Sequence, residues 1–259
     1  MFNPAGPTPS PRQLPSHPLP HQPLELTPGF VLWSSPSGLI LGGHHPITPP
    51  LANPIRENGG PCLTGLPRPV LVIASGNPYK VAEIAAMLDA VDLEVRRQPD
   101  ALEIEETGST YLANARLKAE AVASLTGQWA LADDSGLAVD ALGGAPGVYS
   151  ARYAPTDHER IHRLLQELGP TPYRSASFNS AMALADPSGT TVLEAEGICR
   201  GEILSTKLGP GGGYDPIFWV REAAMTYGQM PAHLKDKLGS RGKAARSIAP
   251  ELKRLLGLR

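Results

Sequence analysis

The stretch VLVIASGNPYK, residues 70–80, decides the fold class because its sequence pattern changes from that of a strand to that of a turn and then to that of a helix start. Residues 70–74 are all apolar and predict a short buried strand. The segment Ser75-Gly-Asn77 predicts a turn, and Pro78 suits the first position of a helix. A strand that turns directly into a helix is typical of an α/β fold. Apolar residues then recur at helical spacing, at Val81, Ile84, Ala85 and Leu88.

The chain after residue 80 continues to alternate between these two patterns, and a hairpin follows. We therefore expect an α/β domain whose mixed, twisted sheet is flanked by helices. Strands are expected at 93–97, at 129–132 (ending at an acidic pair), at 175–185 and 191–198 around a turn at 186–189, and at 216–219. Helices are expected from a Ser109 cap to about 125, at 157–168, and from a Ser240 cap until Pro250 interrupts the helix.

The first 68 residues differ in composition from the rest of the chain. Sixteen of the 28 prolines and four of the seven histidines lie there, a composition that cannot form a packed core. We expect a disordered extension at 1–68 and a folded domain at 69–259. Alternatively, residues 1–68 are not normally translated, because the folded pattern begins abruptly and no Met lies between Met1 and Met87.

Charge and cysteine content narrow the class of protein. The net charge is -2 at pH 7 and the pI is near 6.4, which argues against nucleic acid as a partner. Cys62 and Cys199 form no CxxC pair and no zinc spacing, so they favour a reducing compartment, the cytoplasm. No apolar run approaches the ~18 residues of a membrane helix, and no membrane partner is expected.

The segment SGNPYK, 75–80, is a candidate phosphate site. A turn that leads into a helix presents unpaired backbone N–H groups at the positive end of the helix dipole, and Lys80 lies one turn inside. An ordinary strand–turn–helix junction explains the same residues. The segment lacks the GxxxxGK[ST] pattern of a Walker A loop.

The segment LADDSG, 131–136, is a candidate metal site. Adjacent acids at the end of a strand repel each other unless a cation lies between them. Asp133 and Asp134 with the Ser135 hydroxyl suit Mg²⁺, which binds a few protein oxygens and keeps waters for a phosphate substrate. A capped turn is an equally good explanation of these residues alone.

Two later segments complete a possible nucleotide site. GPGGGYDPIFW, 209–219, predicts a glycine loop that a ligand can approach closely, with Tyr214 to stack or hydrogen-bond and Asp215 to bond a polar group. KDKLGSRGKAARS, 235–247, gathers five basic residues, which form either an anion site or a solvated face. Acids at 103–106 are explained by the helix start that follows them, and Lys118 more simply faces solvent than a ligand.

Six segments, in this order, resemble motifs of the inosine triphosphate pyrophosphatase family, the Ham1/RdgB-like proteins. They are SGNPYK (75–80), ETGST (106–110), ADDSG (132–136), GAPGVYSAR (144–152), GYDPIF (213–218) and SRGKA (240–244). The resemblance spans about 69–257. It implies a homodimeric α/β enzyme with two lobes and a central cleft, which uses Mg²⁺ to hydrolyse dITP, ITP and XTP to the monophosphate and pyrophosphate and so cleanses the nucleotide pool.

The resemblance also implies roles for individual residues. Asp134 matches the proton acceptor and metal ligand, and Asp133 supports it at the metal. The residues that would bind substrate are Ser75, Gly76, Asn77, Pro78, Tyr79 and Lys80 at the phosphates, Ser135 beside the substrate, Gly212, Gly213, Tyr214 and Asp215 on the base side, and Lys235, Ser240 and Arg241.

Three positions depart from the family pattern. Ala113 stands where a Glu that helps the metal site is usual, Gly212 where a Phe stacks on the base, and Ser240 where a His contacts the base. Loss of a stacking ring removes about 1–3 kcal/mol of base affinity in nucleic-acid binding proteins. These departures keep two alternatives open: the same reaction with altered or broad base specificity, and a nucleotide-binding pseudoenzyme.

Overall fold

The computed structural model describes residues 68–89, 91–100 and 102–258. The extension expected at 1–68 lies outside these ranges except for Arg68, so its disorder and the alternative of an untranslated segment stay predictions. The first strand begins at Val70, where the apolar pattern of the sequence begins.

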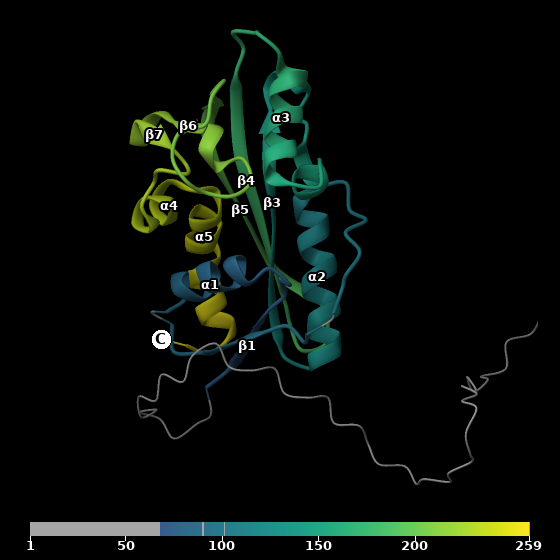
Figure 1. The fold of residues 1–259 in the computed structure, drawn as a ribbon. Coiled ribbons are helices and arrows are strands. Elements are labelled where there is room, and N and C mark those ends of the chain that lie inside the picture. Colours follow the sequence, from purple (N-terminus) through teal and green to yellow (C-terminus); the bar gives the residue numbers. More distant parts are fainter. Residues whose placement is uncertain (1–67, 90, 101, 259) are drawn as a thin grey trace, which may run out of the picture. The chain divides into compact units, whose positions relative to one another are not determined.

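A mixed seven-stranded sheet with the order β2-β1-β3-β4-β5-β6-β7 forms the centre of the fold, and this confirms the predicted fold class (Figure 1). β1 is parallel to β2 and β3, and every later pair is antiparallel. The strands are β1 (Val70–Ile73), β2 (Glu94–Arg97), β3 (Trp129–Val139), β4 (Ser175–Ala185), β5 (Thr191–Ile203), β6 (Phe218–Val220) and β7 (Met225–Thr226).

Helices cover both faces of this sheet. In Figure 1, α1, α4 and α5 lie on one side of β3 and α2 lies on the other. The helices are α1 (Pro78–Met87), α2 (Tyr111–Thr126), α3 (Asp157–Leu168), α4 (Ala232–Leu238) and α5 (Ser240–Leu255), with short 3-10 turns η1 (Asp140–Leu142), η2 (Gly147–Arg152), η3 (Asp215–Ile217) and η4 (Arg221–Ala223). None of the helices in the described part of the chain is long and apolar enough to cross a membrane.

Alternation along the strands sends successive residues to opposite faces of the sheet. Leu71, Ile73 and Leu131 pack against α1 and α5, whereas Val72 and Ala130 pack against α2. The layer under α2 consists mostly of alanine, which lets the helix lie close to the sheet. The same alternation continues along β3 past residue 132, and it decides where the acidic pair points.

A separate core lies at the far end of the long strands. It joins α3 and η3 to the ends of β3, β4 and β5, and Phe218 is fully buried in it. The Phe218 ring meets the edge of Phe178 at a centroid distance of 4.6 Å, a favourable aromatic geometry. The two ends of the sheet thus have different cores, in agreement with the two lobes that the resemblance implies.

The predicted end of β3 is wrong. The strand passes through the acidic pair and runs to Val139. Asp133 pairs with Met182 of β4 and Asp134 pairs with Ala181. A strand can carry two buried acids here because each carboxylate finds cations from other elements, which the local sequence does not reveal.

The predicted helix ends need small corrections. Thr110, not Ser109, caps α2, and its hydroxyl accepts a hydrogen bond from the Ala113 N–H at 3.1 Å. Gly239 is the cap of α5, so Ser240 is its first residue rather than its cap. Pro250 lies inside α5 and does not interrupt it.

Candidate active site

Asp133 and Asp134 project to opposite faces of the sheet. Asp133 lies on the side of α1 and α5, and Asp134 lies on the side of α2, as the alternation along β3 requires. Their side chains are 0% and 8% exposed. The predicted repulsion between neighbours is therefore avoided without a shared cation, because each acid has its own partners.

Asp133 is the centre of a buried charge network. Its Oδ2 lies 3.1 Å from Lys80 Nζ and 3.3 Å from Arg241 Nη2, and it accepts a hydrogen bond from Ser135 Oγ at 3.2 Å. Burial raises the pKa of the Asp133 carboxyl, but attraction to Arg241 and Lys80 outweighs it and holds the pKa well below 3.8. Arg241 also pairs with Glu83 of α1. The network therefore ties α1 and α5 to β3.

Asp134 is held at both of its carboxylate oxygens from α2. Asn114 Nδ2 donates to Oδ2 at 3.1 Å, and Lys118 Nζ lies 3.2 Å from Oδ1. Asn114 is fully buried, and its Oδ1 accepts a hydrogen bond from the Gly108 N–H at 2.8 Å. A Cβ at Gly108 would lie 2.6 Å from this oxygen, so only glycine permits the contact.

Glu106 joins the same cluster from the loop before α2. Its Oε1 lies 2.8 Å from Lys118 Nζ, and its Oε2 lies 3.0 Å from Arg152 Nη1 of η2. Burial raises the pKa of the Glu106 carboxyl, but hydrogen bonds and attraction from Lys118 and Arg152 outweigh it and lower the pKa below 4.5. Lys118 also donates to the main-chain oxygen of Asp133 at 2.9 Å.

The oxygens around Lys118 fit a divalent cation. Two carboxylates, from Glu106 and Asp134, and the main-chain oxygen of Asp133 surround one ammonium group. Mg²⁺ prefers oxygen ligands and is usually held by one or two carboxylates, waters and substrate phosphates. No set of three or more His, Cys, Asp or Glu side chains converges on a metal position within the described ranges, so an all-protein cage is absent there. The Asp133 side chain, which the sequence pairs with Asp134 at the metal, is instead held by Lys80 and Arg241.

Side chains of the candidate phosphate turn accept hydrogen bonds from most of its own backbone N–H groups. Asn77 caps α1, and its Oδ1 accepts hydrogen bonds from the N–H groups of Tyr79 at 2.9 Å and Lys80 at 3.4 Å. Ser75 Oγ accepts a hydrogen bond from the Asn77 N–H at 3.2 Å. Three of the N–H groups that were predicted to be unpaired, those of Asn77, Tyr79 and Lys80, therefore have a partner. The exposed turn residues, Gly76, Asn77, Pro78 and Tyr79, remain open to solvent.

The glycine loop is anchored to α3 and to η2. Gly211 and Gly213 have φ angles of 120° and 56°, which glycine adopts readily. The Gly213 N–H donates to Asp157 Oδ2 at 2.7 Å. Tyr214 is buried, and its hydroxyl donates to the Ser150 main-chain oxygen at 3.2 Å, so its ring packs in the core rather than standing free to stack on a ligand.

The remaining residues that were predicted to bind substrate have three different surroundings: an ion pair, an exposed loop and the protein interior. Asp215 Oδ2 lies 2.9 Å from Lys235 Nζ, and burial raises the pKa of the Asp215 carboxyl above 3.8 in spite of this ammonium. Gly212 is exposed in the loop. Ser240, predicted to bind substrate, is only 4% exposed, and its hydroxyl hydrogen-bonds Ser180 Oγ of β4 at 2.9 Å. A contact between substrate and the Ser240 side chain would have to replace this bond.

Comparison with known proteins places the chain in a family. The sequence profile of the Ham1 family matches residues 71–251. This chain belongs to the Ham1 family. A dITP/XTP pyrophosphatase of Nostoc sp. is 52% identical over 188 residues, which are 72% of this chain and 96% of the relative. A dITP/XTP pyrophosphatase of Parasynechococcus marenigrum is 54% identical over 187 residues, again 72% of this chain and 96% of the relative.

Solved structures of Ham1 proteins share the fold. The HAM1 protein of Coxiella burnetii aligns with a TM-score of 0.66 and 38% identity, and the match covers 72% of this chain and 99% of that chain. The Ham1 protein of Staphylococcus aureus aligns with a TM-score of 0.65 and 37% identity, covering 71% and 98%. In both cases the match includes nearly the whole of the relative.

Sequence reasoning missed several residues of the candidate site. Glu106 and Lys118 were ascribed to helix-start preference and solvent, and Asn114, Arg152 and Glu83 were not singled out. One signal was available: Asn114 and Lys118 are four residues apart and so share a face of α2. Two polar residues on the helix face that meets β3, one of them fully buried, are unusual enough to mark a site.

Position 113 has a local role in this Ham1 chain that the sequence did not indicate. Ala113 is the third residue of α2, where a Glu side chain reaches back to the N–H of the capping residue and forms a capping box. In α3 the box is complete, since Thr156 Oγ1 accepts from the Glu159 N–H and Glu159 Oε2 accepts from the Thr156 N–H. In α2 only the half made by Thr110 exists.

Ala113→Glu is therefore expected to raise the free energy of unfolding by about 0.3–1.5 kcal/mol. Urea denaturation measures this effect, and Ala113→Gln is the matched control because Gln completes the same box without a charge. Equal stabilisation by both variants with unchanged Mg²⁺ affinity supports the capping role. Tighter Mg²⁺ binding in the Glu variant alone would show instead that position 113 faces the metal, as the family pattern implies.

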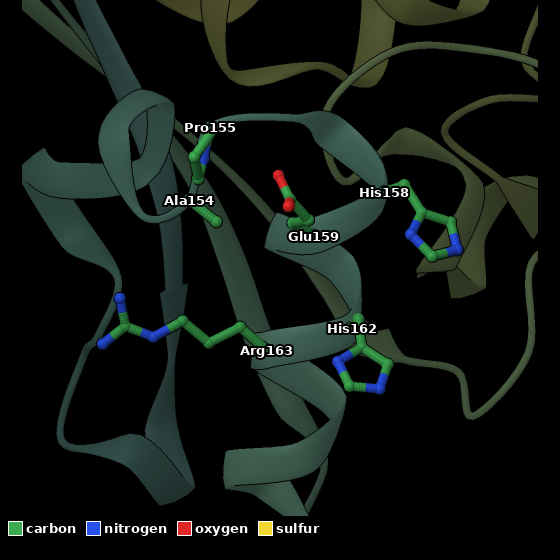
Figure 2. Close-up of a pocket in the computed structure, with 6 residues that line it drawn as sticks. All are labelled: Ala154, Pro155, His158, Glu159, His162 and Arg163. Carbon is green, nitrogen blue, oxygen red and sulfur yellow. The ribbon is translucent and has the colours of Figure 1, made fainter.

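A surface cavity of about 420 Å³ lies along α3 but is not part of this site (Figure 2). Figure 2 shows His158 and His162 on one side of α3, with Glu159 and Arg163 pointing elsewhere. Glu159 is used in the capping box and Arg163 pairs with Glu167. The cavity thus lacks the converging charges that surround Asp133 and Asp134.

Proposed function

We propose that this chain hydrolyses the non-standard purine nucleoside triphosphates dITP, ITP and XTP to the monophosphate and pyrophosphate, and so cleanses the nucleotide pool. The observation that carries the proposal is a cluster in which carboxylate oxygens of Glu106, from the loop before α2, and of Asp134, on β3, hold the cationic Lys118 Nζ. The network of Asp133 with Lys80 and Arg241 starts from the neighbouring residue of β3. Relatives that are named dITP/XTP pyrophosphatase and are about half identical over the whole domain support it.

Asp134 is the proposed proton acceptor. Asn114 and Lys118 fix both of its oxygens, so its orientation is set before substrate arrives. A carboxylate held in this way can accept a proton from the water that attacks a phosphorus atom. Lys80 and Arg241 lie on the neighbouring network around Asp133 and are the proposed partners of the phosphate groups, whose charge they would neutralise in the transition state.

Mg²⁺ is the proposed cofactor, held by Asp134 and Glu106. When bound, it supplies positive charge that neutralises the phosphates and polarises the phosphorus centre. The sequence assigned Asp133 rather than Glu106 as the second ligand. Because the Asp133 carboxylate faces the other side of β3 and is paired with two cations, we propose a positioning role for it.

The proposed partners follow from the family and from the charge of the chain. The substrate is a purine nucleoside triphosphate, no nucleic-acid partner is expected, and we propose a homodimer that works in the cytoplasm. Sedimentation velocity of the purified chain tests the dimer directly, with a monomer as the contrary result.

A second candidate is the same reaction with altered or broad base specificity. Gly212 offers no ring to stack on a base, and the Ser240 hydroxyl is turned to Ser180 rather than toward a ligand. An enzyme distinguishes one base from another by stacking a ring on the base and by hydrogen bonds to it. Weaker selection among purines is therefore expected if both interactions are absent.

Initial rates of pyrophosphate release from dITP, ITP, XTP, dGTP and ATP with Mg²⁺ separate the candidates. If hydrolysis is selective, the kcat/KM values for dITP, ITP and XTP are expected to exceed those for dGTP and ATP at least about tenfold. Similar values for ATP and dITP would favour broad specificity. Binding of dITP without turnover of any triphosphate would identify a pseudoenzyme and overturn the proposal.

A further inference from the structure

Lys118 lies where a metal ion would be expected. Its Nζ is 2.8 Å from Glu106 Oε1, 2.9 Å from the Asp133 main-chain oxygen and 3.2 Å from Asp134 Oδ1. Its side chain is 11% exposed. The three oxygens come from a loop, the backbone of β3 and a side chain of β3, and they meet at a single ammonium group.

We call the three oxygens around Lys118 Nζ the oxygen shell. Each of the two carboxylates in this shell has a second hydrogen-bond partner that does not depend on Lys118. Glu106 Oε2 is bound by Arg152 Nη1 at 3.0 Å, while Oε1 faces Lys118. Asp134 Oδ2 is bound by Asn114 Nδ2 at 3.1 Å, while Oδ1 faces Lys118. The third oxygen belongs to the β3 backbone and is fixed by the sheet. The shell would therefore keep its form if the ammonium left.

We propose that Lys118 occupies the divalent-cation position of the metal-free chain and sets its metal affinity, because the cation can enter only as the ammonium leaves. The inference rests on the proposed function in one respect, that the same oxygens serve the cation used in hydrolysis. At the two oxygens that face it, Glu106 Oε1 and Asp134 Oδ1, the ammonium places one positive charge, whereas a divalent cation would place two. Lys118 thus lowers the repulsion between Glu106 and Asp134 in the metal-free chain and competes with the metal for them.

Calorimetric titration with Mn²⁺, in the absence of nucleotide, tests this competition. Lys118→Met keeps most of the side-chain volume and removes the charge, so it is expected to bind Mn²⁺ at least about tenfold more tightly than the unaltered chain. Arg152→Met is the matched control. It removes a positive charge from the other oxygen of Glu106 but leaves Lys118 in the shell, and it is expected not to tighten binding.

A double variant and a thermal measurement complete the test. Adding Glu106→Gln to Lys118→Met is expected to abolish the gain, since the gain requires both carboxylates. Mn²⁺ is expected to raise the melting temperature of Lys118→Met by more than it raises that of the unaltered chain. This readout also covers the case in which the variant is less stable without metal.

Equal or weaker Mn²⁺ binding by Lys118→Met would overturn the inference and leave Lys118 as an ordinary ion-pair partner. Equal tightening by Arg152→Met would also overturn it, because a general charge effect would then explain the result. Since no nucleotide is present, these outcomes do not depend on whether dITP is hydrolysed. Failure of hydrolysis with the expected Mn²⁺ binding would count against the proposed function alone.

Discussion

Asp134→Asn is expected to lower the rate of dITP hydrolysis by about 10²–10⁴-fold while the fold is retained, the range typical for loss of a general base. Asn has nearly the same shape, and its side-chain oxygen can still accept the hydrogen bond from Asn114 Nδ2. It cannot take a proton from water, and it removes one negative charge from the proposed metal shell. The variant thus separates chemistry from folding.

The rate should be measured as pyrophosphate release at saturating Mg²⁺, with circular dichroism to confirm the fold. Glu222→Gln, which removes an exposed acid from η4, is the matched control and is expected to retain full activity. A loss of less than about tenfold in Asp134→Asn would mean that another group accepts the proton. The role of Asp134 would then have to be reassigned.

Asp133→Asn is expected to reduce the free energy of unfolding by about 3 kcal/mol at neutral pH. Asp133 is fully buried and balances Lys80 and Arg241, so its neutralisation leaves positive charges in the interior without their anion. Urea denaturation measures the effect. Glu202→Gln breaks the exposed pair with Arg221 and is expected to cost less than about 1 kcal/mol, because solvent screens such pairs. Equal losses in the two variants would contradict the buried network.

The same network predicts how stability depends on acidity. The pKa of Asp133 in the folded chain lies below 3.8, the ordinary value, because Arg241 and Lys80 outweigh the effect of burial. A depressed pKa contributes stability above the unfolded value and loses it as the pH falls toward the folded value. The urea midpoint of the unaltered chain is therefore expected to fall more steeply below about pH 4 than that of Asp133→Asn. Parallel profiles would show that Asp133 is not the group responsible.

Local signals in the sequence were sufficient for much of the fold. Pro78 at the start of α1, the alternation of apolar patterns and the turn at 186–189 led to the mixed sheet and to most element positions, which the structure confirms. These features depend on neighbours within a few residues. The end of β3 was wrong because its acids are compensated by Lys80, Arg241 and Lys118, which lie far away in the sequence.

The candidate site was harder to predict from the sequence, because its contacts also join residues of different elements. The position of α2 against β3 brings Asn114 and Lys118 to Asp134, and no local pattern specifies how a helix sits on a sheet. The burial of Tyr214 and Ser240 was also hidden, because each side chain finds its hydrogen-bond partner on another element. Motifs identified the correct segments but not the direction in which each side chain points.

The products formed from dITP test the central proposal most directly. Phosphorus NMR of a reaction with dITP, Mg²⁺ and the full chain distinguishes cleavage after the α-phosphorus from cleavage after the β-phosphorus. A pyrophosphatase of the proposed type releases dIMP and pyrophosphate in equal amounts, with neither dIDP nor inorganic phosphate as a primary product. Formation of dIDP and inorganic phosphate, or no change in dITP, would contradict the function proposed for Asp134 and its partners.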